Sequence, residues 1–563
     1  MIICGLKLTH DGAVAVIKDN KLLFSVELEK INNNPRFTEI KDTSFIEEIL
    51  NQQGVKLEDI DHFVVDGWGG NDQDALAIQP RLTIGTGVNK LSAENKSQPY
   101  ELDIALYTEE SLNENILKEW KLKGLKIGDK EFDYLSYYHA AGHVLGTYCS
   151  SPFAAKNESS YVLVWDGGMY PRLYYFDATN KKIENLGPIF LLIGNVYTIF
   201  SQHFGPFKVS GNFAKDNLSV AGKVMAYIAL GQPRRELFQY FDKIYEESYQ
   251  YPMGFANIFA IEFKKLIAEM NYSDEDILCS FHVYLEELLL KKLIKKVERN
   301  KKKSGNICLS GGCALNIKWN SAIRNSGYFN GVYVPPFPND SGSAIGMACC
   351  AMISKTNNSF IDWSVYCGPQ IIQNEPAIGW ISQKCTISKL ADILYTTKEP
   401  VVFLNGHAEI GPRALGNRSI VADPTSKKMK DILNRIKIRE DYRPVSPICI
   451  ENKASEIFEP GLSDPYMLFD HIVKEEWLSK IPAVIHLDNT ARLQTVNQNE
   501  NSIITELLME YEKISQIPLL CNTSANYKGC GFFPDVFSAT KWNGVNYVWC
   551  NNTLYERIEK IRF

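Results

Sequence analysis

Short apolar runs separated by polar turns open the chain. They predict three strands, over Ile2–Leu8, Ala13–Lys18 and Leu22–Leu28. The turns between them are His10-Asp11-Gly12 and Asp19-Asn20-Lys21. Such a meander is common to many folds, so the pattern predicts local structure here and no function.

Two periods alternate along the rest of the chain. Apolar residues at helical spacing predict helices over Thr43–Gln53 and Asp274–Arg299. Continuous apolar runs predict buried strands at Tyr161–Trp165 and Val401–Leu404. Helices that alternate with buried strands are typical of an α/β fold.

Two stretches lack either period. Residues 70–130 are polar and irregular, and we interpret them as an insertion. Residues 355–375 are similar, and we place a domain boundary there, dividing the chain into 1–365 and 366–563. With about 100–200 residues per domain, 563 residues allow two to four domains.

Composition narrows the class of protein. Hydrophobic residues make up 45% and charged residues 22%, and the formal net charge is −6, which favours neither nucleic acid nor an anionic membrane as partner. We find no signal peptide and no apolar run near the ~20 residues of a membrane span. The thirteen cysteines include no C-x-x-C pair, so we expect reduced thiols and a cytoplasmic protein.

A histidine pair is the first candidate for chemistry. His139 and His143 lie four residues apart, which on a helix places both imidazoles on one face. Asp166 and Asp340 follow strand-like runs and supply carboxylates, although Asp166 could instead cap its strand or touch substrate. Two histidines with one or two aspartates suit a mixed nitrogen and oxygen metal site.

Glycine-rich turns follow two predicted strands. Ser310–Asn316 reads SGGCALN and Asn339–Gly346 reads NDSGSAIG. A strand, glycines and a helix start expose backbone N–H groups to a phosphate. The plainer interpretation is a pair of turns in an ordinary α/β sheet.

The densest motif is Gly406–Pro424, GHAEIGPRALGNRSIVADP, in which Arg413 and Arg418 stand among three glycines. Guanidinium groups in such a loop suit phosphate or carboxylate, although solvated arginines are the commoner outcome for one G-x-R. Later motifs add cations, and together they favour a polyanionic small ligand over a solvated face. The cations on these five motif positions are Arg413, Arg418, Lys437, Arg443 and Arg492.

Gly406–Pro424 resembles the signature of the nodulation- and antibiotic-type O-carbamoyltransferases, with mild departures at His407, Ile410 and Val421. Three further stretches resemble motifs of that family, as does Thr9–Ala13, which departs at both ends. They are Lys437–Pro447, His486–Gln494 and Pro518–Asn526. The resemblance runs from Ile2 to about Ala539 and is weakest at 70–130 and 230–275.

The resemblance implies an N-terminal actin-like (ASKHA, threonylcarbamoyl-transferase-like) domain and a C-terminal YrdC-like α/β domain. It implies a divalent metal on His139, His143, Asp166 and Asp340, with Fe²⁺ first and Mn²⁺, Mg²⁺ or Zn²⁺ as alternatives. The catalytic candidates are His10, Asp11, Arg413, Arg418, Lys437, Arg443 and Arg492. The nucleotide and substrate candidates are Gly222, Lys223, Gly311, Gly312, Asn316, Ser341, Gly342, Ser446, Thr490, Asn522 and Ser524.

The implied reaction is ATP-dependent. Carbamoyl phosphate and ATP would give carbamoyl adenylate, and the carbamoyl group would pass to a hydroxyl of a small molecule, with His10 or Asp11 as base. The acceptor could be a sugar, an aminoglycoside, a macrolide or an alkaloid alcohol, and the protein a monomer or homodimer. The alternatives are a tRNA threonylcarbamoyl-type transferase, an actin-like-fold small-molecule kinase and a non-catalytic nucleotide-gated binding protein.

Overall fold

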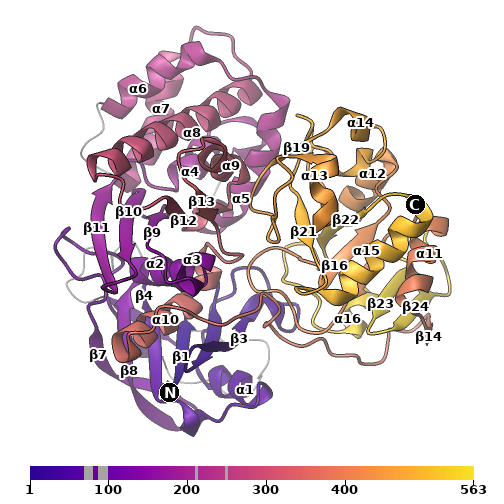
Figure 1. The fold of residues 1–563 in the computed structure, drawn as a ribbon, viewed down its shortest axis with the longest axis horizontal. Helices are drawn as coiled ribbons and strands as arrows, with labels where there is room; N and C mark the ends of the chain where they lie inside the picture. Colours follow the sequence, from indigo (N-terminus) through magenta and orange to yellow (C-terminus); the bar gives the residue numbers. More distant parts are fainter. Residues whose placement is uncertain (69–79, 86–98, 209–212, 247–251) are drawn as a thin grey trace.

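The computed structural model describes residues 1–68, 80–85, 99–208, 213–246 and 252–563. The described chain forms two lobes that lie side by side (Figure 1). We call residues 1–356 the N-lobe and residues 380–563 the C-lobe, with residues 357–379 between them. Helices and strands are mixed in both lobes, which confirms the predicted α/β class.

The first N-lobe sheet is built around the N-terminal strand. The meander pairs antiparallel, β1 then pairs parallel with β4 and β4 with β8, and β7 closes the edge antiparallel to β8. Strands β1 and β2 are almost wholly buried, because helices cover their sheet. In sheet order the strands are β3 (Lys21–Glu27), β2 (Ala13–Lys18), β1 (Ile2–Lys7), β4 (His62–Gly67), β8 (Lys130–Tyr138) and β7 (Trp120–Ile127).

The second N-lobe sheet repeats this arrangement. Strands β9, β10 and β11 form an antiparallel meander. Strand β9 then pairs parallel with β12, and β12 pairs parallel with β13. Both sheets therefore share one order of strands with the same directions. In sheet order the strands are β11 (Lys182–Pro188), β10 (Arg172–Asp177), β9 (Ser160–Val164), β12 (Asn306–Ser310) and β13 (Gly331–Tyr333).

Two helices pack between these sheets. Helix α10 (Ser343–Thr356) contacts β1, β2 and β4, while α2 (His139–Cys149) contacts β9 and β12, and the helices pack on each other. They cross at glycines: a Cβ on Gly346 would stand 2.1 Å from the carbonyl oxygen of Gly142. Only a residue without a side chain permits so close an approach of two backbones.

A helical layer covers the outer side of the second sheet. Its longest member is α8, which an N-cap at Ser273 starts and which ends where the sequence predicts. Phenylalanines from four of these helices form its core. The N-lobe helices are α1 (Ser44–Gln52), α2, α3 (Pro152–Ala155), α4 (Val196–Ser201), α5 (Phe213–Tyr227), α6 (Phe238–Glu246), α7 (Pro252–Leu266), α8 (Asp274–Arg299), α9 (Ile317–Asn325) and α10.

The C-lobe has its own sheet and hydrophobic core. In sheet order its strands are β14 (Trp380–Lys384), β24 (Thr553–Arg557), β23 (Tyr547–Cys550), β15 (Val401–Leu404), β16 (Arg418–Ala422), β22 (Leu519–Ser524), β17 (Ser446–Ile450) and β21 (Gln494–Val496). Its helices are α11 (Ile387–Thr397), α12 (Lys427–Ile436), α13 (Ala454–Ile457), α14 (Glu475–Leu478), α15 (Ser502–Ser515) and α16 (Val536–Lys541). The small sheet strands are β18 (Phe458–Glu459), β19 (His471–Val473) and β20 (Thr490–Ala491).

The interpretation of 70–130 as an irregular insertion is wrong at its C-terminal end. Trp120–Ile127 is strand β7, an edge strand whose exposed lysines alternate with less exposed residues. The segment also holds a small hairpin of β5 (Arg81–Ile84) and β6 (Tyr100–Asp103), while 69–79 and 86–98 lie outside the described residues. Alternation of lysines along an edge strand was the missed signal.

Buried contacts join the lobes. Lys30 donates to the carbonyls of Glu409 and Gly411, the latter at 2.8 Å, and the N–H of Gly411 donates to Glu27 at 2.6 Å. Ile410 packs in the core beneath α2 and α10. Gly411 lies in the Gly406–Pro424 motif, whose loop before β16 we call the motif loop. This loop therefore belongs to the interface between the lobes as much as to the C-lobe.

Among the helices of the described residues, none is long and apolar enough to cross a bilayer.

Candidate metal centre and anion-binding site

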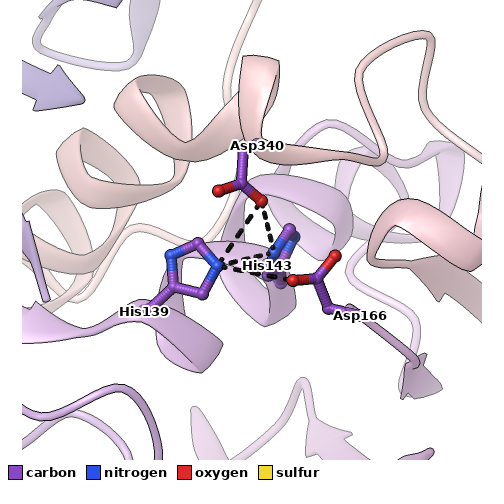
Figure 2. A group of neighbouring side chains, drawn as sticks. All are labelled: His139, His143, Asp166 and Asp340. Atoms are coloured by element: carbon purple, nitrogen blue, oxygen red, sulfur yellow. Dashed lines mark hydrogen bonds and ion pairs between the residues drawn. The ribbon is translucent and has the colours of Figure 1, made fainter. Parts of the chain in front are cut away.

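Four side chains converge at the centre of the N-lobe: His139, His143, Asp166 and Asp340 (Figure 2). One ligand atom from each lies within 4.8 Å of the others. The two Nε2 atoms are 3.1 Å apart, and each stands 3.5 Å from Oδ1 of Asp340. Asp166 completes the group, with its Oδ2 3.9 Å from Nε2 of His139.

Local structure explains this convergence. His139 opens α2 and His143 follows one turn later, so both imidazoles leave the same face of the helix. Asp166 comes just after β9, and Asp340 lies in the short turn η8 (Asp340–Gly342) that precedes α10. Since α2 and α10 pack together and β9 contacts α2, the ligands of both helices and the strand end meet.

A buried carboxylate and a buried lysine support the cluster. Asp66 accepts from Nδ1 of His139 at 2.9 Å, which directs Nε2 into the cluster. Lys7, fully buried, lies 2.8 Å from Asp66 Oδ2 and 2.9 Å from Asp340 Oδ2. Burial alone would raise the pKa of Asp66, but His139 and Lys7 outweigh it and lower that pKa to about 2.

The same charges act on the ligands. Burial favours neutral His139, yet Asp66 and Asp340 raise its pKa well above the usual value. Burial would raise the pKa of Asp340, but Lys7 and His139 hold it well below its ordinary range. The carboxylates of Asp66 and Asp340 are therefore ionised, and their negative charge faces the histidines.

Two aromatic rings line the cluster. The ring of Tyr107 stacks on His139 at 4.7 Å, and its hydroxyl donates to Asp166 Oδ2 at 2.7 Å. Trp68 lies over Lys7, 4.3 Å from ring centroid to Nζ, and edge-on to His10 at 4.3 Å. Tyr107 thereby holds Asp166 in position, while Trp68 packs on Lys7 and His10.

His10 and Asp11, the two candidate bases, lie beside the same centre. His10 Nδ1 is 2.8 Å from Asp11 Oδ2, and its Nε2 is 3.6 Å from Asp340 Oδ2. Asp11 has a φ of 58°, the left-handed conformation that turns its carboxylate back toward the ring. The pair stands at the edge of the cluster, where the imidazole remains partly exposed.

The donor set fits a divalent cation. Ligand atoms that share one cation at about 2.1 Å stand about 3–3.5 Å apart, and three of the four contacts here are of that size. The two Nε2 atoms face each other at 3.1 Å, and their lone pairs repel unless a proton or a cation lies between them. Imidazole with carboxylate suits Fe²⁺, Mn²⁺ or Zn²⁺.

The glycine-rich turns lie beside this centre. Gly311, at φ 84°, passes so close to the backbone of Trp165 that a Cβ would stand 2.4 Å from its carbonyl oxygen. The N–H of Gly312 donates to Asp166 Oδ1 at 2.7 Å. Asn316 caps α9, and the Ser341 hydroxyl donates to Asn339 at 2.9 Å. Gly342 is the residue before α10.

Two of the candidate nucleotide-binding residues lie on a different element from these turns. Gly222 and Lys223 lie within α5, on whose surface Gly222 is exposed. No described atom lies within 4 Å of a Cβ built on Gly222. Gly222 and Lys223 therefore lie in the interior of a helix and not in a glycine-rich turn.

The C-lobe gathers arginines that have few acidic partners. Burial and the charges of Arg36 and Arg443 lower the pKa of Arg413 to about 10. Burial and the charges of Arg413 and Arg443 lower that of Arg492 well below its usual value. The Nε of Arg413 is shielded from solvent and has no hydrogen-bond partner among the described residues. We call Arg413, Arg443 and Arg492, with their cationic neighbours Arg36, Lys437 and Arg439, the arginine cluster.

Two predicted anion-binding cations are instead engaged by the backbone. Arg418, 1% exposed, donates from its two terminal nitrogens to four carbonyls, those of Asn405, Asn417, Pro369 and Gly406. Lys437 donates to the carbonyls of Ser524 and Asn526, both at 2.8 Å, and to the Asn526 side chain. In this structure Arg418 orders the motif loop and Lys437 orders the end of β22.

Two of the polar C-lobe candidates contact the arginine cluster, Ser446 through Arg492 and Ser524 through Lys437. The hydroxyl of Ser446 accepts from Arg492 Nε at 3.0 Å. Thr490 donates to Asp488 at 2.7 Å, and Ser524 donates to Asn526 at 2.7 Å. Asn522 is buried and donates to the carbonyl of Ala414 and to Gln494, so it fixes the loop that carries Arg413.

Sequence reasoning missed several residues of both sites. Asp66 follows a strand-like run just as Asp166 does, and that parallel could have revealed it. Lys7 gave the weaker signal of a charge inside an apolar strand. Tyr107 and Arg36 gave none, because their contacts depend on segments distant in the chain.

Fold and site together define a two-lobed α/β protein with a buried candidate metal cluster and a separate cluster of arginines. The family models "Carbamoyltransferase N-terminus" and "Carbamoyltransferase C-terminus" match residues 2–349 and 391–557. The chain therefore belongs to the carbamoyltransferase family and is an enzyme of that type.

Full-length relatives agree. "Nodulation protein U" of Sinorhizobium fredii (strain NBRC 101917 / NGR234) is 44% identical, with 99% of each chain covered. "3'-hydroxymethylcephem-O-carbamoyltransferase" of Streptomyces clavuligerus is 30% identical, again with 99% of each covered. Among solved structures, the activator of 2-hydroxyisocaproyl-CoA dehydratase from Clostridium difficile with bound ADPNP matches 63% of this chain and 95% of its own. Its identity is 14% and its TM-score 0.32, too low to carry an argument.

Proposed function

We propose that this enzyme is an ATP-dependent O-carbamoyltransferase that acts in two steps. Carbamoyl phosphate, ATP and water give carbamoyl adenylate, phosphate and pyrophosphate. A hydroxyl of a small-molecule acceptor then takes the carbamoyl group, and AMP leaves. The observation that carries this proposal is the presence in one chain of a buried two-histidine, two-aspartate cluster and a separate cluster of arginines. A relative whose name specifies O-carbamoylation of a hydroxymethyl group supports the acceptor class.

We assign the two steps to two domains, 1–365 of actin-like fold and 366–563 of YrdC-like fold. The repeated strand order of the two N-lobe sheets supports the first assignment, since a duplicated meander and parallel pair on each side of packed helices is what an actin-like domain requires. The separate sheet and core of the C-lobe support the division.

The first step belongs in the C-lobe. ATP and carbamoyl phosphate are both polyanions that repel each other, so bringing them together needs fixed positive charge. Arg413, Arg443 and Arg492 provide it, and Ser446 holds the guanidinium of Arg492 in place. Planar guanidinium forks pair with two phosphate oxygens at once and thereby orient the reacting groups.

The second step belongs in the N-lobe. His139, His143, Asp166 and Asp340 would hold the metal, which when bound polarises an oxygen and neutralises phosphate charge. His10, held through Nδ1 by Asp11, presents Nε2 to take the proton of the acceptor hydroxyl. Trp68 packs edge-on against His10, and Tyr107 stacks on His139. The backbones of Gly311 and Gly342, beside Asp166 and Asp340, would flank the AMP moiety.

The assay of the first step omits the acceptor. The purified protein is incubated with ATP, carbamoyl phosphate and a divalent metal, and pyrophosphate and a carbamoyl-adenylate mass are followed. Wild type should release pyrophosphate, Arg443→Ala should lose it, and Arg435→Ala, at an exposed position of α12, should retain it. Pyrophosphate from Arg443→Ala at the wild-type rate would contradict the assignment of the C-lobe. ADP in place of pyrophosphate and AMP would indicate the kinase alternative.

The role of His10 is tested separately. His10→Asn should leave pyrophosphate release intact and slow transfer to acceptor by about 10²-fold or more, since general bases contribute that much. Near-normal transfer in this variant would remove His10 from the mechanism.

A further inference from the structure

One lysine of the N-lobe bridges two carboxylates of the C-lobe. Lys318 lies in the first turn of α9, and its Nζ donates to Asp470 Oδ2 at 2.9 Å and to Asp488 Oδ2 at 2.6 Å. Its side chain is 21% exposed, so the bridge is largely closed off from solvent. Lys318 belongs to neither the metal centre nor the arginine cluster, and its contacts with the C-lobe are separate from those of Lys30.

Helix α9 holds the backbone on both sides of the Asp470 side chain. The N–H of Asp470 donates to the hydroxyl of Ser321 at 2.7 Å, and its carbonyl accepts from Arg324 Nη2 at 3.2 Å. The guanidinium of Arg324 also lies over the ring of Phe469, 4.2 Å from the centroid. The carboxylate of Asp470 is therefore fixed beside Lys318 by the same helix.

A chain of hydrogen bonds connects the other carboxylate to Arg492. Asp488 Oδ1 accepts from the hydroxyl of Thr490 at 2.7 Å, and that hydroxyl lies 3.0 Å from His486 Nδ1. His486 Nε2 accepts from the backbone N–H of Arg492 at 3.3 Å. Burial lowers the pKa of His486 to about 4, so the neutral ring donates from Nδ1 and accepts at Nε2. Lys318 therefore holds one end of a chain whose other end is the backbone of Arg492.

The lysine separates two negative charges. Burial would raise the pKa of Asp488, but Lys318 outweighs it and lowers that pKa to about 2. Asp470 Oδ1 is buried and has no hydrogen-bond partner among the described residues, with His486 Nδ1 4.0 Å away. Without the lysine, the carboxylates of Asp470 and Asp488 would face each other across the space that Nζ occupies. Their repulsion would push Asp488, and the turn that begins there, away from α9.

We infer that Lys318 is a positioning residue for Arg492: by drawing Asp488 toward α9, it fixes the turn that sets the guanidinium of Arg492 against Ser446. The inference rests on the proposed function for the identity of the anion that Arg492 binds, and on the contacts above for the path. A residue of the N-lobe thus controls the geometry of the arginine cluster in the C-lobe. Helix α9 directly follows the glycine-rich turn beside the metal centre, so one helix contacts both sites.

The test is calorimetric titration of the full chain with pyrophosphate, a probe of phosphate chains that requires no turnover. Wild type should bind it, and Lys318→Met should bind about 10-fold more weakly, the loss expected when a charged hydrogen bond is misplaced. Lys318→Arg keeps the cation and should recover part of the affinity. Lys318→Met combined with Asp470→Asn should recover most of it, because only one of the two facing carboxylates remains.

A double-mutant cycle shows whether the effect passes through Arg492. Arg492→Met should itself weaken pyrophosphate binding, and adding Lys318→Met to it should cause little further loss, since residues that act as one unit are not additive. Lys295→Met removes the same charge from an exposed position of α8, which packs on α9, and should leave binding unchanged. Additive losses in the cycle would mean that Lys318 acts on the anion independently of Arg492, which contradicts the inference.

Other outcomes are equally decisive. Wild-type affinity in Lys318→Met or in Arg492→Met, or no binding of pyrophosphate by wild type, would overturn the inference. So would a Lys318→Met protein that melts at a lower temperature and whose affinity Asp470→Asn does not restore, because the lysine would then only stabilise the docked lobes. If the cycle is non-additive but wild type releases no pyrophosphate from ATP and carbamoyl phosphate, the positioning role is supported and the proposed function fails.

Discussion

At the scale of single residues, buried charged side chains surround the candidate metal centre. Lys7 neutralises two carboxylates, of which one, Asp340, faces the histidines and the other, Asp66, holds His139. Each of these charged side chains has a partner of opposite charge, which is the condition under which ionised groups are tolerated in a protein interior. The removal of one of them should therefore lower the free energy of unfolding much more than the loss of an exposed ion pair.

Lys7→Met should lower the free energy of unfolding of the metal-free protein by about 3–5 kcal/mol, because it leaves two buried carboxylates without their cation. Urea unfolding followed by circular dichroism measures this change. Lys123→Met removes a lysine of β7 in the same sheet, whose side chain is 81% exposed, and should change stability by less than about 1 kcal/mol. Equal effects of the two variants would show that the buried ion pairs of Lys7 contribute no more to stability than an exposed lysine does.

Asp66→Asn should weaken binding of a divalent cation by about 10–100-fold, since a hydrogen-bonded carboxylate orients the imidazole of His139. Titration calorimetry of the full chain with Mn²⁺ gives the affinity. Asp133→Asn, at a largely exposed position of β8, is the matched control. An unchanged affinity in Asp66→Asn would mean that packing alone orients His139.

At the scale of elements, the crossing of α2 and α10 decides whether ligands from two distant segments meet. Three glycines, Gly142, Gly146 and Gly346, bring the two backbones together. The histidines lie on one of these helices and Asp340 directly precedes the other. The distance between the helices therefore sets the distance between the ligands.

Gly346→Ala should destabilise the protein by about 1–3 kcal/mol or more and weaken cation binding, because its Cβ would stand 2.1 Å from a backbone oxygen. Thermal unfolding and Mn²⁺ titration test both effects. Gly222→Ala is the comparison for stability alone. No described atom lies near its added methyl group, and alanine in a helix interior should stabilise by about 0.5–1 kcal/mol. Stabilisation by Gly346→Ala would contradict the close crossing.

Helix α8 carries a carboxylate whose ionisation should oppose folding. Burial, and to a smaller extent Glu287 and Asp470, raise the pKa of Glu286 from 4.5 to about 7, although Lys318 acts in the opposite direction. The folded protein thus binds more protons than the unfolded chain between pH 4.5 and 7. Its free energy of unfolding should fall as pH rises through that window, by about 3 kcal/mol at most.

Glu286→Gln should remove this contribution and be more stable than wild type at pH 8, while the two proteins should be alike near pH 4.5. Urea unfolding at intervals between these pH values measures the difference. Glu287→Gln, whose side chain is 46% exposed, should keep the wild-type slope. A constant difference between Glu286→Gln and wild type across the range would refute the shifted pKa.

At the scale of the whole molecule, the lobes are joined by buried polar groups as well as by apolar packing. Lys30, 2% exposed, pairs with Glu27 at 2.7 Å and donates to two carbonyls of the motif loop. The same loop crosses the N-lobe closely at Gly411, where a Cβ would stand 2.0 Å from the carbonyl oxygen of Pro336. The loop that carries Arg413 therefore also contacts the segment leading to Asp340.

Lys30→Met should uncouple the lobes as well as destabilise the chain, because it removes the cation that bridges Glu27 and the motif loop. Calorimetry should show a lower first transition and a wider separation between transitions. Lys18→Met, at an exposed position of β2, should leave the trace unchanged. A uniform shift of the whole trace for Lys30→Met would show that the contact stabilises without coupling.

The sequence by itself determined most local structure and the family. The strand Ala13–Lys18 and the helix Asp274–Arg299 have the predicted bounds, because hydrophobic periodicity and caps act over neighbouring residues. It also singled out His139, His143, Asp166 and Asp340, since residues that share a helix face or end a strand are visible as spacing.

Only the tertiary structure decided which charged groups face a site and which support it. Arg418 and Lys437 look like Arg413 in the sequence, yet the fold surrounds the first two with carbonyl oxygens. Within the part of the chain that the structure describes, one nitrogen of Arg413 has no partner. Lys7, Arg36 and Arg439 acquire their surroundings from segments distant in the chain. Burial and long-range contact determine what a charge does, and neither is local in the sequence.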